Sequence, residues 1–128
     1  MAVVVLDSSV LIALLNTSDS HHKACKRFVE NSNKSFKISV ITLMEVLISP
    51  MREGAVVTKR IISALEKRFP DRIAVDEEIA MAAAKIRAHS NLVMPDSIIS
   101  ATALVHSATL VTCDATLAKK HPGAELIR

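Results

Sequence analysis

The strongest constraint on the fold is the short apolar run Val3–Leu6, which ends directly at Asp7. Its three consecutive valines are β-branched and favour extended backbone, and the lack of polar alternation indicates a strand buried on both faces. Strands of this kind belong to parallel sheets that carry helices on each side. The run therefore predicts a central strand of a parallel sheet, with Asp7 at its carboxyl end.

The rest of the chain alternates further short apolar stretches with segments of helical periodicity. This order is typical of an α/β fold in which helices connect parallel strands and cover both faces of the sheet. We expect a single domain over residues 1–128, folded as a three-layer α/β/α sandwich with a central, mainly parallel sheet. The further strands are predicted at residues 36–39, 72–75, 109–111 and 125–127.

Two of the predicted helices carry acidic residues near their starts. A helix from Thr42 is expected to hold Glu45 in its first turn and to end near Pro50, since proline breaks helix interiors. Another helix opens at Pro95-Asp96, and its residues are apolar almost all round, which predicts that it is buried.

Composition narrows the class of protein. Half of the residues are hydrophobic, but no apolar run approaches the roughly 20 residues that a membrane-spanning helix needs. The apolar start has no basic segment before it, so it does not resemble a secretory signal, and we expect a soluble, cytoplasmic protein. Cys25 and Cys113 lie in no metal-ligand spacing, which favours two structural thiols over zinc or a disulfide framework.

Four acidic residues occupy positions from which they can reach the carboxyl edge of the predicted sheet. Asp7 directly follows the first strand, and Asp114 stands three residues after the strand that ends at Val111. Asp96 and Glu45 lie near the starts of their helices. Ligands of parallel α/β sheets bind beyond the carboxyl ends of the strands. We therefore predict that the four carboxylates converge on one rim.

Such a cluster calls for a cation, because like charges at short range otherwise force at least one carboxylate to keep its proton. A site built only of Asp and Glu oxygens suits Mg²⁺ or Mn²⁺. Either ion can lower the pKa of a bound water and stabilise the charge that develops on a phosphodiester during hydrolysis. The four acids thus predict a metal-dependent phosphodiester hydrolase.

Each acid also has a purely structural interpretation. Asp7 could cap the first helix, although the two serines that follow it can do so instead, and Asp96 is a good N-cap by itself. Asp114 alone would be an ordinary loop acid. Glu45 is the exception, because it stands in an otherwise apolar turn where an unpaired carboxylate is costly.

The distribution of charge is consistent with a polyanionic substrate. The formal net charge is +3, from 16 Lys and Arg against 13 Asp and Glu, so with four acids in one pocket nine remain elsewhere. A basic surface around an acidic pocket suits a nucleic acid whose phosphates contact the basic residues. The only aromatic residues are three phenylalanines, which disfavours a platform on which bases stack.

Three stretches of the sequence together resemble PIN-domain proteins. Residues 3–15, VVVLDSSVLIALL, look like the family's opening strand and helix. Residues 94–104, MPDSIISATAL, are similar to its PDxxIxATA helix, and residues 110–114, LVTCD, to its LvTxD ending. Glu45 falls where the family has an acid after the second strand. One departure is Leu117, where the family often has an aromatic residue.

The resemblance covers the whole chain, and the single-domain size resembles the VapC group, the toxin ribonucleases of toxin–antitoxin pairs. It implies a parallel sheet between helices, Mg²⁺ or Mn²⁺, RNA as the substrate, a small antitoxin that blocks the site, and usually a homodimer. It assigns an acidic site with nearby hydroxyls, made of Asp7, Glu45, Asp96 and Asp114 with Thr112 and Ser9 as secondary candidates.

Two other interpretations stay open. A non-catalytic module that binds RNA or a partner on the same fold would be expected to lack one or more of the acids, and all four are present. A receiver domain would need an acidic pair before its phosphorylated Asp and a Lys after a late strand, and neither is at a persuasive place. Gly-rich phosphate loops are absent, which disfavours nucleotide binding.

Overall fold

The structure is a computed structural model that describes residues 2–128, so Met1 of the expected domain range lies outside it. In this part of the chain five strands form one parallel sheet, in the order β3-β2-β1-β4-β5. The expected central parallel strand is confirmed, because β1 lies in the middle of the sheet. The strands are β1 (Val3–Leu6), β2 (Ser35–Ser39), β3 (Arg72–Ile73), β4 (Thr109–Thr112) and β5 (Glu125–Leu126).

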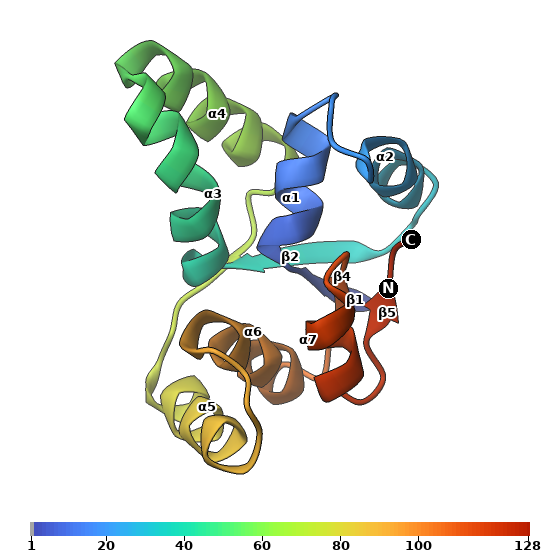
Figure 1. Cartoon of the computed structure of the whole chain (residues 1–128), viewed down its shortest axis with the longest axis vertical. Coiled ribbons are helices and arrows are strands. Elements are labelled where there is room, and N and C mark those ends of the chain that lie inside the picture. Colours follow the sequence, from blue (N-terminus) through green and yellow to red (C-terminus); the bar gives the residue numbers. More distant parts are fainter. Residues whose placement is uncertain (1) are drawn as a thin grey trace.

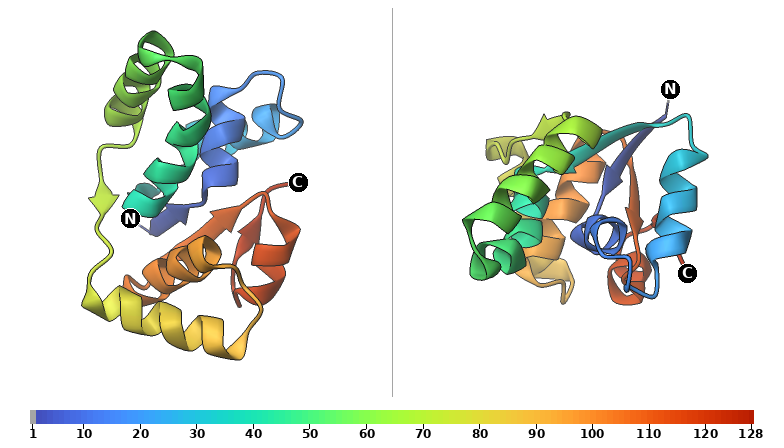
Figure 2. Two further views of the ribbon diagram at one scale, coloured as in Figure 1. Left: turned by 60° about the vertical axis from the view of Figure 1, so that its left-hand side comes forward. Right: turned by 90° about the horizontal axis from the view of Figure 1, so that it is seen from above.

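Helices cover both faces of this sheet, which confirms the predicted three-layer sandwich (Figures 1 and 2). One layer holds α1 (Ser8–Leu15), α2 (His22–Glu30), α3 (Val40–Glu53) and α4 (Ala55–Arg68). The other layer holds α5 (Glu77–His89), α6 (Met94–Val105) and α7 (Ala115–Lys120). The hairpin of α3 and α4 extends beyond the sheet (Figure 1).

The apolar run of β1 supplies side chains to both layers. Val4 and Leu6 are fully buried in the core beneath α1, α2 and α3, whereas Val5 is fully buried in the core formed with α5 and α6. Successive side chains of a strand point to opposite faces, so a strand covered on both sides needs apolar residues at every position. This explains why the run shows no polar alternation.

The start and the end of α3 differ from the prediction. The N-cap is Ser39, whose hydroxyl accepts a hydrogen bond from the Ile41 N–H (3.1 Å), so the helix begins before Thr42. Glu45 therefore lies in the second turn of α3. The helix also continues past Pro50 to Glu53. Proline at this position removes only the bond that its own N–H would make, and the helix ends one turn later.

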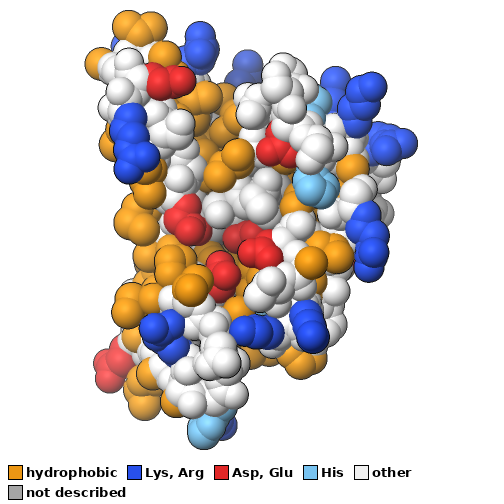
Figure 3. Space-filling model, in the orientation of Figure 1, with side chains coloured by type: hydrophobic (Ala, Val, Ile, Leu, Met, Phe, Trp, Pro, Cys, Tyr) orange, Lys and Arg blue, Asp and Glu red, His pale blue; other side chains and the backbone are white. Residues whose placement is uncertain are grey.

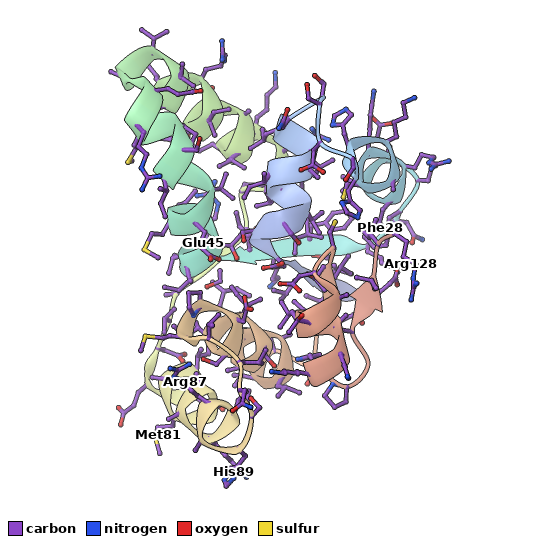
Figure 4. The ribbon with its side chains drawn as sticks, viewed as in Figure 1. Phe28, Glu45, Met81, Arg87, His89 and Arg128 are labelled. Carbon is purple, nitrogen blue, oxygen red and sulfur yellow. The ribbon has the colours of Figure 1, made fainter. Side chains whose placement is uncertain are left out.

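The helix that carries Asp96 also begins earlier than expected. Val93 is at the N-cap of α6, so Asp96 is the third residue of the helix and the N-cap interpretation was wrong. The segment before α6 is fixed by Arg87 of α5, whose guanidinium donates to the Leu92 carbonyl at 2.6 Å (Figure 4). As expected for its sequence, α6 is largely buried. No helix within residues 2–128 is long and apolar enough to cross a membrane.

Candidate active site

Asp7 is held at the carboxyl end of β1 by two hydroxyl groups. Its side chain is 4% exposed, and its Oδ2 accepts hydrogen bonds from Ser9 Oγ and Thr112 Oγ1, both at 2.8 Å. Asp7 occupies the N-cap position of α1, yet its carboxylate makes no capping bond within the described part of the chain. The Asp7 side chain is therefore hydrogen-bonded to Thr112 of the neighbouring strand β4 and does not cap α1.

The same two hydroxyls connect Asp7 to the segment after β4. Thr112 Oγ1 accepts from the Asp114 N–H (2.9 Å), and Ser9 Oγ accepts from the Cys113 N–H (3.0 Å). Each hydroxyl thus donates to the carboxylate and accepts from a backbone amide, which uses both of its functions. This arrangement fixes the end of β1 relative to the end of β4.

Asp114 caps α7. Its Oδ1 accepts from the backbone N–H groups of Thr116 (2.8 Å) and Leu117 (3.3 Å), and the residue is exposed. Both capping bonds go to Oδ1, so the Asp114 Oδ2 atom takes no part in capping the helix. Leu117, at the place where the resemblance suggested an aromatic residue, is fully buried in the core beside α6.

Glu45 has a buried oxygen without a hydrogen-bond partner. Its Oε1 accepts no bond from any described residue, and in Figure 4 the residue lies on the part of α3 next to the sheet. Burial raises the pKa of Glu45, the negative charge of Asp7 raises it further, and a hydrogen bond from the Ser8 side chain opposes both effects. Ser8 was not among the predicted site residues.

The pKa of Asp96 is affected by two other carboxylates. Burial, followed by the charges of Asp7 and Asp114, raises the pKa of Asp96 to about 6. The charge of Asp96 in turn helps to raise the pKa of Glu45. All four predicted acids therefore belong to one electrostatic group, and acidic side chains gather at the centre of the face shown in Figure 3.

Two buried side chains hold the helices that carry Asp96 and Asp114 together. Ser100 of α6 and His121 after α7 are hydrogen-bonded at 2.6 Å between Oγ and Nδ1, and each is 3% exposed. Burial lowers the pKa of His121, which favours a neutral ring. No local sequence pattern indicates this pair, because its members lie in separate elements.

The four carboxylates match a divalent cation in donor type. Within residues 2–128, no three acidic, imidazole or thiol side chains lie close enough to form a compact metal site. However, the donors are all carboxylate oxygens, which Mg²⁺ and Mn²⁺ prefer. The unpartnered Glu45 Oε1 and the raised pKa values of Glu45 and Asp96 are features that a bound cation would relieve.

A cleft of about 430 Å³ opens beside Glu45, between α1, α3 and α4. Its wall combines apolar side chains such as Ile12, Leu15 and Ile61 with the charged side chains of Glu53 and Arg60. The cleft follows from the way in which the α3–α4 hairpin leans on α1, a packing that the sequence pattern did not predict. It leads from the acidic group to the outer end of the hairpin.

The family model named PIN domain matches residues 4–121. The chain belongs to the PIN-domain family. The predicted resemblance is thereby confirmed, and the parallel sheet with its acid-bearing strand ends is the fold of this PIN domain. No curated protein sequence matches the chain closely enough to count as a relative.

Several solved structures share the fold of this PIN domain. A toxin–antitoxin complex from Klebsiella pneumoniae contains a chain with 27% identity and a TM-score of 0.82, with 98% of each chain covered. FitAcB from Neisseria gonorrhoeae has 20% identity and a TM-score of 0.80, with 96% of each chain covered. VapC20 from Mycobacterium tuberculosis, a Sarcin-Ricin loop cleaving toxin, has 16% identity and a TM-score of 0.79, with 98% of this chain and 99% of that chain covered.

Proposed function

We propose that this PIN domain is a metal-dependent endoribonuclease that hydrolyses RNA phosphodiester bonds and acts as the toxin of a toxin–antitoxin pair. The observation that carries the proposal is the electrostatic group of Asp7, Glu45, Asp96 and Asp114, with the unpartnered Glu45 Oε1 inside it. Carboxylates whose charges raise the pKa values of Glu45 and Asp96 are suited to binding a cation.

Asp7, Glu45, Asp96 and Asp114 would hold Mg²⁺ or Mn²⁺. When bound, such an ion supplies a more acidic water and stabilises negative charge on the phosphodiester. The chain's own residues prepare the site: Ser9 and Thr112 orient the Asp7 carboxylate through two hydrogen bonds of 2.8 Å. Burial and the charges of Asp7 and Asp114 raise the pKa of Asp96 to about 6, so near neutral pH its carboxylate would readily exchange its proton for the cation.

Basic helices flank the acidic group and favour RNA as the substrate. Lys and Arg side chains surround the acidic centre in Figure 3. Among the exposed basic residues, α2 carries Lys23, Lys26 and Arg27, and α7 carries Lys119. Phosphates on either side of the scissile bond would contact these cations while the bond itself lies at the carboxylates.

The toxin role rests on the resemblance to the VapC group and on the Klebsiella pneumoniae toxin–antitoxin complex. The cleft between α1, α3 and α4 is a suitable place for a small antitoxin, because a segment bound there would reach Glu45 and obstruct the site. A cytoplasmic location is part of this proposal, since an RNA substrate would be met there.

A homodimer is favoured by an apolar stripe on the outer side of α3. The α3 stripe is formed by side chains three or four residues apart that are 38–60% exposed, namely Val40, Met44, Ile48 and Met51. Residues at this spacing share one helix face, and hydrophobic side chains line the left edge of Figure 3 where α3 lies. An apolar stripe of this kind suits contact with a second copy.

The test is cleavage of structured RNAs by the purified chain with Mg²⁺ or Mn²⁺, with chelator, and by two matched variants. Asp7→Asn removes one charge from the acidic group, whereas Asp71→Asn makes the same change at an exposed residue outside it. We expect Asp7→Asn to lower the cleavage rate at least about 100-fold and Asp71→Asn to leave it unchanged.

The proposal fails if the wild type cuts none of the RNAs, or if chelator or Asp7→Asn leaves cleavage intact. RNA binding without cleavage would favour the non-catalytic module on the same fold.

A further inference from the structure

The two cysteines of the chain lie in contact. Cys25 of α2 and Cys113, between β4 and α7, have their sulfur atoms 3.3 Å apart although they are separated by 88 positions in the sequence. Cys25 is fully buried, whereas Cys113 is partly exposed. Both are free thiols in the structure. The sequence favoured two independent structural thiols, because nothing in their spacing indicated that they meet.

The contact is close to the geometry of a disulfide. An S–S bond is about 2.05 Å long, so the sulfur atoms need to approach by only roughly 1 Å, a shift within reach of small side-chain rotations. The chain has no third cysteine that could compete. Because Cys113 is partly exposed, a small oxidant can reach its sulfur. The sulfur of Cys25 is buried next to it.

We propose that Cys25 and Cys113 form an oxidation site, at which a hydroperoxide converts the two thiols into a reversible intramolecular disulfide. The sulfur of Cys113 attacks the peroxide O–O bond, which breaks, and yields a sulfenic acid and one molecule of water or alcohol. The sulfur of Cys25 then attacks the sulfenic sulfur of Cys113 and the S–O bond breaks. The hydroxide that leaves takes up the proton of the Cys25 thiol and departs as water. Two electrons pass from the thiols to the peroxide.

The position of the pair gives this chemistry a structural consequence. The N–H of Cys113 donates to Ser9 Oγ, which in turn donates to Asp7, and Cys113 directly precedes Asp114. A disulfide would tie α2 to the segment that carries these contacts. The inference does not depend on the proposed nuclease activity, since it concerns only the thiols and their contact.

The experiment uses the full chain, treated with an equimolar amount of hydrogen peroxide and then alkylated in denaturant. Trypsin separates Cys25, in the peptide of residues 24–26, from Cys113, in the peptide of residues 88–119. We expect these two peptides to be joined after oxidation and to separate after treatment with dithiothreitol. The oxidised chain should melt roughly 10 °C higher, because the crosslink closes a long loop.

Two variants test the order of the steps. In Cys25→Ala, oxidation should stop at a sulfenic acid on Cys113 that a sulfenic-acid-specific reagent traps. In Cys113→Ala, the buried Cys25 should stay reduced in the folded chain. The proposal is overturned if wild-type chains still carry two alkylatable thiols after oxidation, or if Cys113 instead links two chains. The wild-type result decides this even if a variant folds poorly.

Discussion

Asp7 and Asp96 carry the same charge at the candidate site but are held differently. Two hydroxyl donors orient the carboxylate of Asp7, whereas burial and the charges of Asp7 and Asp114 raise the pKa of Asp96. Asp7 is therefore suited to be a ligand held in a fixed orientation. Asp96 exchanges a proton with solvent in the metal-free protein and would lose that proton when a cation binds.

At the residue scale, Thr112→Val tests the hydroxyl that joins Asp7 to Asp114. Valine keeps the shape but removes the donor to Asp7 and the acceptor of the Asp114 N–H. We expect the free energy of unfolding to fall by about 1–3 kcal/mol, since the buried Asp7 carboxylate loses one of its two donors and the Asp114 N–H loses its acceptor. Cleavage should also decline, because the Asp7 carboxylate is no longer oriented.

Thr102→Val is the matched control, since Thr102 is equally buried but donates only to the Ile98 carbonyl within α6. Urea unfolding and cleavage assays on both variants make the comparison. Equal losses in stability and activity for the two would show that the hydroxyl of Thr112 has no special role.

The raised pKa of Asp96 predicts how the metal-free protein responds to pH. Folding raises this pKa from its ordinary value of 3.8 to about 6. The folded protein therefore binds the Asp96 proton more tightly than the unfolded chain does. This contribution to stability is fully present below pH 3.8 and is lost as pH rises through about 6. We expect wild type to lose about 1 kcal/mol relative to Asp96→Asn between pH 4 and pH 7, after allowance for solvent screening at this partly exposed group.

Urea unfolding of both proteins across this range, in chelator, measures the difference. Adding Mn²⁺ at pH 7 should restore the stability of wild type more than that of Asp96→Asn. Parallel stability curves for the two proteins would contradict the assigned pKa.

At the element scale, the strands were predictable to within one or two residues. Strand β3 ends at Ile73 and not at residue 75, and β4 ends at Thr112 and not at residue 111, whereas the starts of α3 and α6 were misplaced. The apolar run of β1 and the short stretch of β4 indicated their positions directly, which also placed Asp7 and Asp114 beside strand ends. The start of α3 was misplaced because its cap, Ser39, is also the last residue of β2. Hydrogen bonds between distant segments, such as Thr112 to Asp7, depend on register across the sheet, which a local pattern does not contain.

Asp114 has two roles, because its side chain caps α7 and its charge belongs to the acidic group, and two substitutions distinguish these roles. Serine also caps helices, so Asp114→Ser should keep α7 while removing the carboxylate, whereas Asp114→Ala should lose both. We expect Asp114→Ala to be about 1 kcal/mol less stable than Asp114→Ser, with cleavage equally reduced in the two variants. Thermal unfolding and cleavage rates measure the two effects. Wild-type cleavage by Asp114→Ser would remove this residue from the proposed site.

At the scale of the whole molecule, the α3 stripe predicts self-association. Ile48→Asp places a charge in the middle of the stripe and should convert a dimer into a monomer, because burying an unpaired charge at the interface is costly. The control is Val56→Asp on α4, a residue 82% exposed and outside the stripe. Light scattering coupled to size-exclusion chromatography gives both masses. A monomeric wild type, or a dimeric Ile48→Asp, would contradict the prediction.

The order of strands in the sheet bears on when the molecule becomes active. β1 and β4 are neighbours, with Leu6 paired to Val111, so Asp7 acquires Thr112 only after more than a hundred further residues have been added. A chain grows from its amino end, and domains fold as units once enough of the chain is made. A nascent chain that has not yet reached residue 112 therefore holds Asp7 with Ser9 alone and lacks both Thr112 and Asp114. On the proposed function, such a partial chain would not cleave RNA while it is still being synthesised.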